Sequence, residues 1–124
     1  MAQATISFEE VPSNVPGSLV KIVKIIGQLD ESNVDEKAKE IYAVLEANPK
    51  NLSLIFDVTG LEYMNSKSVG YLTDWYQKVT ETGGSLVVVG AKPNIYDILQ
   101  VVGLTQLINF YQTLDEAKFA VMKK

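Results

Sequence analysis

The chain has 124 residues and a formal charge of −4, from 11 basic and 15 acidic residues. It contains no histidine and no cysteine, and every basic residue is a lysine. Imidazole bases, thiolates, disulfides and guanidinium clamps for phosphate are therefore absent from its chemistry. These absences exclude most designs of hydrolases, oxidoreductases and kinases. They favour a binding or regulatory domain with no catalytic residue, no metal site and no cofactor of its own.

The bulk composition predicts one folded domain over residues 1–124. Hydrophobic residues make up 47% of the chain and charged residues 21%, as in ordinary folded proteins. No apolar run approaches the ~18–20 residues of a membrane span, and the first residues lack the features of a signal peptide. We therefore expect a cytoplasmic protein without membrane insertion. Scattered lysines on an acidic chain argue against binding to nucleic acid.

The first half of the chain predicts a hairpin, a helix and a buried strand. Apolar stretches at 6–11 and 18–26 are typical of strands, and the proline- and glycine-containing segment between them predicts a long hairpin loop. Residues 27–33 are expected to end the second strand and to cap a helix. That helix ends at Asn48-Pro49, and its apolar residues recur at helical spacing: Val34, Ala38, Ile41 and Leu45. The apolar run 52–58 predicts a central strand that ends at Thr59-Gly60.

The second half alternates helices and strands. A helix is expected after Ser68, with Gly83-Gly84 at its end, followed by a buried strand at 85–90. The residues expected on the core side of that helix are Val69, Leu72, Tyr76 and Val79. The next helix spans 94 to about 102, with inward residues Ile95, Ile98, Leu99 and Val102 and with Gly103 as its C-terminal cap.

A short strand at 107–111 and a last helix complete the chain. Thr113-Leu-Asp-Glu116 has the spacing of a capping box, which predicts the start of that helix. Buried strands that are separated by helices imply right-handed crossovers and a parallel or mixed sheet. We therefore predict an α/β fold with a mixed sheet of about four to five strands and about four helices, packed mainly on one side.

The segment 54–72 resembles the core of the STAS domain, the family of sulfate-transporter cytoplasmic domains and bacterial anti-sigma-factor antagonists. In that family an apolar strand and a short acidic turn lead into an Asp-Ser-Ser-Gly-like motif that opens a helix. Asn65-Ser66-Lys67-Ser68 occupies this place, with Asn65 where the antagonists usually carry Asp. The likeness extends over residues 6–120, and its further motifs are Gly27–Asp30, Gly83–Gly90, Val102–Leu104 and Thr113–Ala117.

The resemblance implies partner switching in transcription regulation. The unphosphorylated antagonist binds an anti-sigma factor serine kinase and so frees the sigma factor. Phosphorylation then breaks the complex, and a serine phosphatase of the PP2C type restores it. ATP belongs to the kinase, so this chain needs no cofactor. Two alternatives remain: a STAS scaffold subunit of a stress-signalling or lipid-transport assembly that is not phosphorylated, and a STAS module that binds a nucleotide or lipid. A homodimer is also left open.

Ser66 aligns with the serine that partner kinases phosphorylate in the family, and Ser68 is the fallback acceptor. The residues themselves allow a simpler interpretation, because Asn and Ser at a helix start cap free N–H groups, typically worth ~1 kcal/mol. The same location also suits a phosphate, since exposed amides and the helix dipole stabilise an anion. Lys67 could neutralise part of its charge. Capping and phosphorylation are therefore both consistent with the sequence.

Two further features belong to the predicted partner surface. Asp30 and Glu31 follow a strand and are expected at the same sheet edge as Asn65, where Asp30 either caps a helix or contacts a partner. Tyr71 and Trp75 share a helix face, which is either part of the core or a docking surface. The predicted partner-binding residues are Asp30, Glu31, Asn65, Ser66, Lys67, Ser68, Tyr71 and Trp75.

Overall fold

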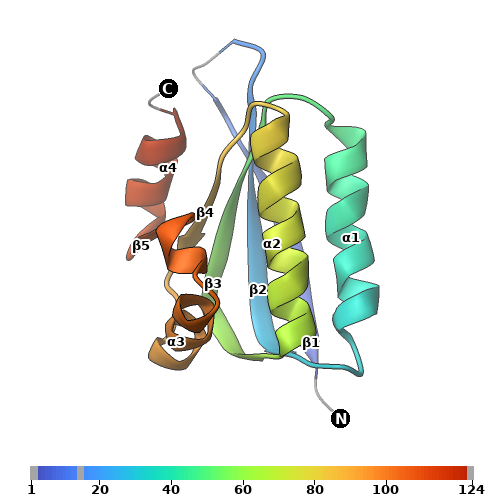
Figure 1. Cartoon of the computed structure of the whole chain (residues 1–124). Coiled ribbons are helices and arrows are strands. Elements are labelled where there is room, and N and C mark those ends of the chain that lie inside the picture. Colours follow the sequence, from blue (N-terminus) through green and yellow to red (C-terminus); the bar gives the residue numbers. More distant parts are fainter. Residues whose placement is uncertain (1–2, 14–15, 123–124) are drawn as a thin grey trace.

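Five strands form one mixed sheet at the centre of the molecule. The computed structural model describes residues 3–13 and 16–122. The strand order is β1-β2-β3-β4-β5 (Figure 1). β1 runs antiparallel to β2, and the other neighbours are parallel, which confirms the predicted hairpin and mixed sheet. The strands are β1 Ala4–Val11, β2 Leu19–Leu29, β3 Leu52–Met64, β4 Leu86–Val89 and β5 Asn109–Tyr111.

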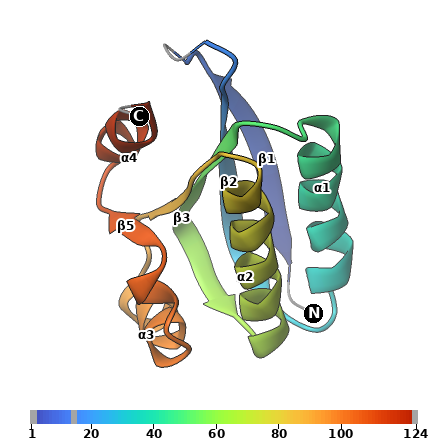
Figure 2. The same cartoon turned by 45° about the horizontal axis from the view of Figure 1, so that its top comes forward.

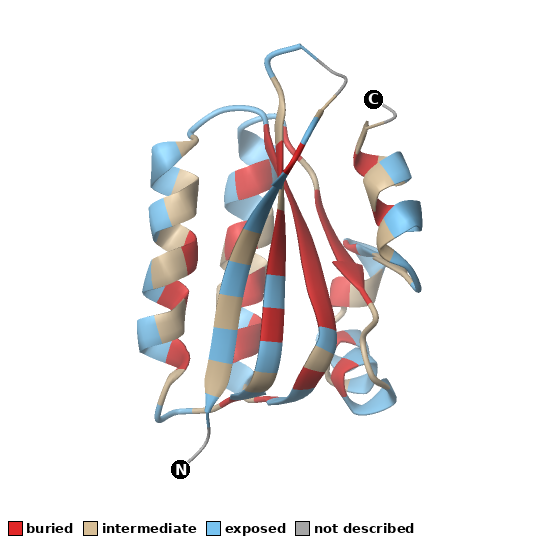
Figure 3. Ribbon diagram, turned by 180° about the vertical axis from the view of Figure 1, so that it is seen from behind, coloured by how far each residue is buried: buried red, intermediate tan, exposed pale blue. Residues whose placement is uncertain are grey.

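Four α-helices cover the two faces of this sheet unequally. α1, α2 and α3 pack on one face, and α4 packs alone on the other (Figures 1 and 2). Seen from behind in Figure 3, α4 lies on the β4 and β5 side, and β1 and β2 are uncovered over much of their length. The helices are α1 Val34–Ala47, α2 Ser66–Glu81, α3 Pro93–Val101 and α4 Leu114–Met122, with a 3₁₀ turn η1 Leu104–Gln106.

The central strand β3 contributes to two cores. Residues 52–58 are all buried, because alternate side chains point to opposite faces and both faces are covered there. Leu54 and Phe56 belong to the large core under α1, α2 and α3. Ile55 belongs to a smaller core that includes Ala117 of α4. The continuous apolar run in the sequence is therefore explained by helices on both sides of β3.

Both central strands extend further than the sequence predicted. β2 continues through 27–29, so these residues belong to the sheet and not to a loop. β3 continues past Thr59-Gly60 to Met64, because the pairing with β2 shifts there instead of ending. Lys24 pairs with Asp57, and Ile26 then pairs with Gly60. The turn-forming residues thus produce an irregularity within the strand.

The helix boundaries follow local signals, with two exceptions in side-chain placement. The capping box is confirmed, because the Thr113 N–H donates to Glu116 Oε1 at 3.1 Å and the Glu116 N–H donates to Thr113 Oγ1 at 3.2 Å. Val102, predicted to point inward, is 55% exposed because α3 ends before it and Gly103 turns the chain at φ +85°. Trp75 is more deeply buried than Tyr76, the aromatic residue predicted for the core face.

The last strand is shorter than predicted. Within the predicted strand 107–111, only residues 109–111 pair with β4. Residues 107 and 108 connect the η1 turn to this strand. In the part of the chain that the structure describes, no helix combines the length and the apolar character needed to cross a membrane.

Candidate functional site

The carboxyl ends of β2 and β3 meet at one edge of the sheet, which is the lower edge in Figure 1. β2 leads into the loop that begins at Asp30, and β3 leads into Asn65. The Asn65 N–H donates to the Leu29 carbonyl at 3.1 Å, which ties the two chain segments together. The expected juxtaposition of Asp30 and Asn65 therefore follows from parallel pairing of their strands.

Asn65 caps α2 through a single oxygen. Its Oδ1 accepts the Ser68 N–H at 2.9 Å and the Ser68 hydroxyl at 2.6 Å. Asn65 has an extended backbone, as expected for an N-cap residue. Ser68 is only 1% exposed. The Ser68 hydroxyl is therefore enclosed and engaged in the cap.

Ser66 has the opposite environment. It is the first residue of α2 and is exposed. Within residues 3–13 and 16–122, its hydroxyl makes no hydrogen bond. The first amide groups of a helix have no partners inside the helix, and they attract anions. Ser66 is therefore accessible to another protein and lies where an added negative charge is tolerated.

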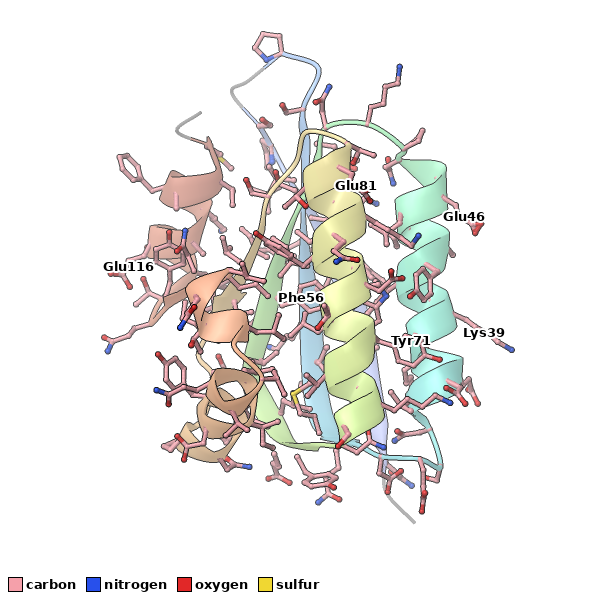
Figure 4. All side chains as sticks on the ribbon, viewed as in Figure 1. Lys39, Glu46, Phe56, Tyr71, Glu81 and Glu116 are labelled. Carbon is pink, nitrogen blue, oxygen red and sulfur yellow. The ribbon has the colours of Figure 1, made fainter. Side chains whose placement is uncertain are left out.

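Asp35, in the first turn of α1, joins α1 to α2. The Lys67 ammonium lies 2.8 Å from Asp35 Oδ1 and 3.0 Å from Oδ2. The Tyr71 hydroxyl donates to Asp35 Oδ1 at 2.6 Å, and Figure 4 shows Tyr71 between the two helices. We call Asp35, Lys67 and Tyr71 the Asp35 cluster. The acceptor Asp35 was missed at the sequence level, because the spacing of the residues indicated only that Tyr71 shares a helix face with Trp75.

Hydrogen bonds in the Asp35 cluster shift the acid–base behaviour of its members. The Lys67 ammonium, followed by the Tyr71 hydroxyl, holds the pKa of Asp35 below its ordinary value. The Asp35 carboxylate in turn raises the pKa of Lys67 and the pKa of Tyr71. The ion pair is therefore charged at neutral pH, and Lys67 is engaged with α1.

Asp30 organises its own loop. Its Oδ1 accepts the Ser32 hydroxyl at 2.6 Å and the Ser32 N–H at 2.9 Å, and the hydroxyl contact is the main reason why the pKa of Asp30 is lowered. Its backbone N–H donates to Asn33 Oδ1 at 3.0 Å, and its carbonyl accepts the Val34 N–H at 2.9 Å. The carboxylate thus shapes the turn before α1, and Glu31 beside it is exposed.

Trp75 lies in the core between α2 and the sheet. It is 4% exposed and stacks on Phe56 at 5.6 Å and on Tyr71 at 5.9 Å between ring centroids. Its indole N–H has no hydrogen-bond partner among the described residues. Of the two aromatic residues predicted for the partner surface, the structure leaves Tyr71 at the edge and encloses Trp75.

Comparison of the sequence with known protein families identifies the family of this chain. The STAS domain model matches residues 10–117, which is most of the chain. The chain belongs to the STAS domain family. The resemblance seen in the sequence is thereby confirmed, and the edge that carries Asn65 and Ser66 lies within the matched part of the STAS domain.

Known STAS proteins give the same result. The chain is 22% identical over 92 residues to the anti-sigma F factor antagonist of Paenibacillus polymyxa. These aligned residues make up 74% of this chain and 78% of the relative. A crystal structure of an anti-sigma factor antagonist from Mycobacterium paratuberculosis is 25% identical, with a TM-score of 0.72 over 93% of this chain and 94% of that one. This STAS domain therefore resembles anti-sigma factor antagonists at low identity.

The fold agrees with that of a further antagonist. The anti-sigma factor antagonist SpoIIAA in its unphosphorylated form is 18% identical, with a TM-score of 0.75 over 95% of this chain and 98% of that one. The Bacillus protein SpoIIAA has also been solved in its phosphorylated form, with a TM-score of 0.71 at 19% identity over 94% of this chain and 99% of that one. At these identities the likeness concerns the fold, a single STAS domain with five strands and four helices.

Proposed function

We propose that this STAS domain is an anti-sigma factor antagonist whose binding to a partner is controlled by phosphorylation of Ser66. The unphosphorylated form binds an anti-sigma factor serine kinase and thereby frees a sigma factor. The main support is the exposed Ser66 hydroxyl at the start of α2, at the same sheet edge as the loop with Asp30 and Glu31. The names of its relatives from Paenibacillus and Mycobacterium support the choice of partner.

The chain acts as substrate and not as enzyme in this proposal. Ser66 Oγ attacks the γ-phosphorus of ATP, which the kinase holds. The bond from that phosphorus to the bridging oxygen breaks, ADP leaves, and a base on the kinase takes the hydroxyl proton. The STAS domain supplies one exposed oxygen on a fixed helix start. A PP2C-type phosphatase hydrolyses the phosphoserine and restores the binding form. Because the kinase needs ATP, this cycle of phosphorylation and dephosphorylation takes place in the cytoplasm.

Burial favours Ser66 over Ser68 as the acceptor. Ser68 Oγ is enclosed and donates to Asn65 Oδ1, so a kinase would have to open the start of α2 to reach it. Ser66 needs no such opening. The proposal therefore assigns phosphorylation to Ser66 and a capping role to Ser68.

Release follows from the added charge. A phosphoserine carries about −1.5 to −2 charges at neutral pH. Around Ser66 the chain already presents carboxylates on the loop before α1 and on the first turn of α1, including Asp30, Glu31 and Asp35. A partner surface that accommodates the neutral hydroxyl would meet a strongly negative one after phosphorylation. We expect this change to weaken the complex with the kinase.

Recovery of partners from the source cells, followed by phosphorylation in vitro, tests the proposal. The tagged chain should retain a serine kinase of the ATPase fold. Incubation with that kinase and ATP should add the mass of one phosphoryl group to the intact protein. Ser66→Ala should abolish the gain. Ser7→Ala, which removes an exposed serine of β1, should retain it.

Other outcomes favour the alternatives. A mass gain that survives Ser66→Ala contradicts the assignment of the acceptor. Recovery of a transporter complex without a kinase supports the scaffold interpretation. If neither is recovered and a nucleotide or lipid raises the melting temperature, a ligand-binding STAS module is supported instead. Phosphorylation that leaves the affinity for the kinase unchanged contradicts the release mechanism.

A further inference from the structure

Lys67 follows the proposed phosphoacceptor directly in the sequence, yet its ammonium group contacts Asp35 of α1 and not Ser66. Its ammonium contacts both oxygens of Asp35, at 2.8 Å and 3.0 Å. Tyr71, one helical turn further along α2, donates to the same carboxylate at 2.6 Å. The cation nearest to Ser66 in the sequence is therefore bound to a carboxylate of α1 in the unmodified protein.

The Asp35 cluster remains accessible to solvent and to rearrangement. The side chains of Lys67 and Asp35 are 58% and 55% exposed. Lysine carries its charge on a flexible stem of four carbons, so the ammonium can move without movement of the backbone. Neighbouring residues on a helix point in different directions. Lys67 must therefore rotate about its side-chain bonds to turn from Asp35 toward Ser66. Lys67 lies in the first turn of α2, so no preceding turn of that helix obstructs this rotation.

We propose that Asp35 holds Lys67 in the unmodified protein and that a phosphoryl group on Ser66 takes Lys67 away from it, so that the start of α1 responds to the state of Ser66. This inference rests on the proposed phosphorylation of Ser66. It makes Asp35 and Lys67 positioning residues, which act on the partner surface through their exchange of contacts.

The direction of the exchange follows from charge. The phosphoryl group carries about −1.5 to −2 charges and three acceptor oxygens, against a single charge on the Asp35 carboxylate. The chain contains no arginine that could bind the phosphate in place of Lys67. The groups that act on Asp35 are Lys67, Tyr71 and Lys39. After the exchange Asp35 keeps the neutral Tyr71 hydroxyl and the more distant Lys39, and it faces a new anion.

The loop at the proposed partner surface is coupled to this cluster through α1. Asp35 is the second residue of α1. The first residue, Val34, donates its N–H to the Asp30 carbonyl at 2.9 Å. Loss of the Lys67 contact therefore loosens the helix turn to which the Asp30 loop is attached. Phosphorylation of Ser66 changes this loop as well as the charge around it.

A protein with phosphoserine installed at position 66 during synthesis tests the inference without a kinase or a partner. The readout is the second pKa of the phosphate, followed by phosphorus NMR, which is ordinarily near 6. Pairing with Lys67 favours the dianion, so Lys67→Met should raise this pKa. Lys78→Met removes the same charge from the last turn of α2 and should leave it unchanged. Asp35→Asn should lower it, because Lys67 is then released to the phosphate.

A combination of the two substitutions separates exchange from simple repulsion. If Asp35 acts by holding Lys67, the effect of Asp35→Asn should shrink in the Lys67→Met background. The amide resonances of the first turn of α1 should also shift on phosphorylation in the unsubstituted chain and less in Lys67→Met. An unchanged phosphate pKa in Lys67→Met overturns the inference, as does an equal effect of Asp35→Asn in both backgrounds. These measurements need no kinase, so they can fail while the proposed function holds. The proposed function fails if no kinase phosphorylates Ser66, or if phosphorylation does not release the kinase from this chain.

Discussion

Asn65 connects the proposed phosphorylation site to the stability of α2 through one oxygen atom. Its Oδ1 accepts both the N–H and the hydroxyl of Ser68. Asn65→Ala removes both bonds and leaves the buried Ser68 hydroxyl without its acceptor. We expect a loss of about 1–2 kcal/mol in the free energy of unfolding, the upper part of the range for N-cap residues. Urea denaturation measures this loss.

Asn65→Asp is the matched control. A carboxylate can accept the same two bonds, and its negative charge lies at the helix end that favours anions. The antagonists that this sequence resembles usually carry Asp at this place. The free energy of unfolding should therefore equal that of the unsubstituted protein or exceed it by about 0.3–1 kcal/mol. If Asp destabilises as much as Ala, the cap does not depend on the oxygen acceptor.

Single residues differ in how far the sequence determines them. The capping role at Asn65-Ser66-Lys67-Ser68 was predictable, because a cap acts within one helical turn. The acceptor for Lys67 and Tyr71 was not, because Asp35 reaches them only after α1 and α2 have packed together. Trp75 could not be assigned either, since its spacing from Tyr71 fits both a surface and a core face. Stacking on Phe56 of β3 decides for the core.

The contact between α1 and α2 gives the fold a dependence on pH. Because Lys67 and Tyr71 lower the pKa of Asp35 in the folded chain, Asp35 stabilises the fold above its unfolded pKa of about 3.9. This contribution is lost as the pH falls through the lower pKa of the folded state. Asp35→Asn should therefore reduce the loss of stability between about pH 6 and about pH 3.

Urea midpoints at the two pH values measure this effect. Glu36→Gln is the control, because it removes the next carboxylate of the same helix turn without touching Lys67 or Tyr71. It should retain more of the acid sensitivity than Asp35→Asn. Equal acid sensitivity in Asp35→Asn and the unsubstituted chain would mean that the ion pair has no influence on folding.

Two glycines near opposite ends of α2 have opposite requirements. A Cβ on Gly70 meets nothing within 4 Å, and the residue is exposed in the helix, so Gly70→Ala should raise the free energy of unfolding by about 0.5–1 kcal/mol. A Cβ on Gly84 would overlap the Leu52 carbonyl oxygen, where β3 begins. Gly84→Ala should lower stability by about 1–3 kcal/mol. Thermal and urea unfolding of the pair measure both signs, and a stabilising Gly84→Ala would contradict the close approach seen here.

Element boundaries were predictable where the signal is local. Thr113 and Glu116 satisfy each other at the start of α4, and the spacing alone predicted it. The end of β3 was not predictable in this way. Thr59-Gly60 is a turn signal, but pairing with β2 carries the chain past it to Met64. Sheet pairing is a property of two strands, and the residues of one strand do not specify it.

At the scale of the whole molecule, the helices cover the two faces of the sheet unequally. α1, α2 and α3 cover one face completely enough to form the large core, and α4 covers only part of the other. The sequence predicted a central strand at 52–58 from its apolar run, and it predicted helices mainly on one side. It did not predict which helix lies on the second face, because the apolar residues of α4 fit either face equally well.

The second face allows a direct comparison of covered and uncovered positions. Ile55 in β3 is fully buried under α4, and Ile22 pairs with it in β2. Ile26, four residues further along β2 and on the same face, is 46% exposed. Ile55→Ala should cost about 2–5 kcal/mol in the free energy of unfolding, since it leaves a cavity between β3 and α4. Ile26→Ala removes the same atoms from a position near solvent and should cost less than about 1 kcal/mol.

Urea denaturation of the two variants gives the free energies, and Ala117→Gly provides a third position within the same small core. If α4 is a stable part of the domain, Ile55→Ala and Ala117→Gly should both lower the urea midpoint, with one transition for the whole chain. Equal costs for Ile55→Ala and Ile26→Ala would mean that α4 detaches in solution and leaves Ile55 as exposed as Ile26. The helix cap at Asn65 lies between Met64 and Val69, which belong to the large core on the other face of the sheet, so it should remain formed even in that case.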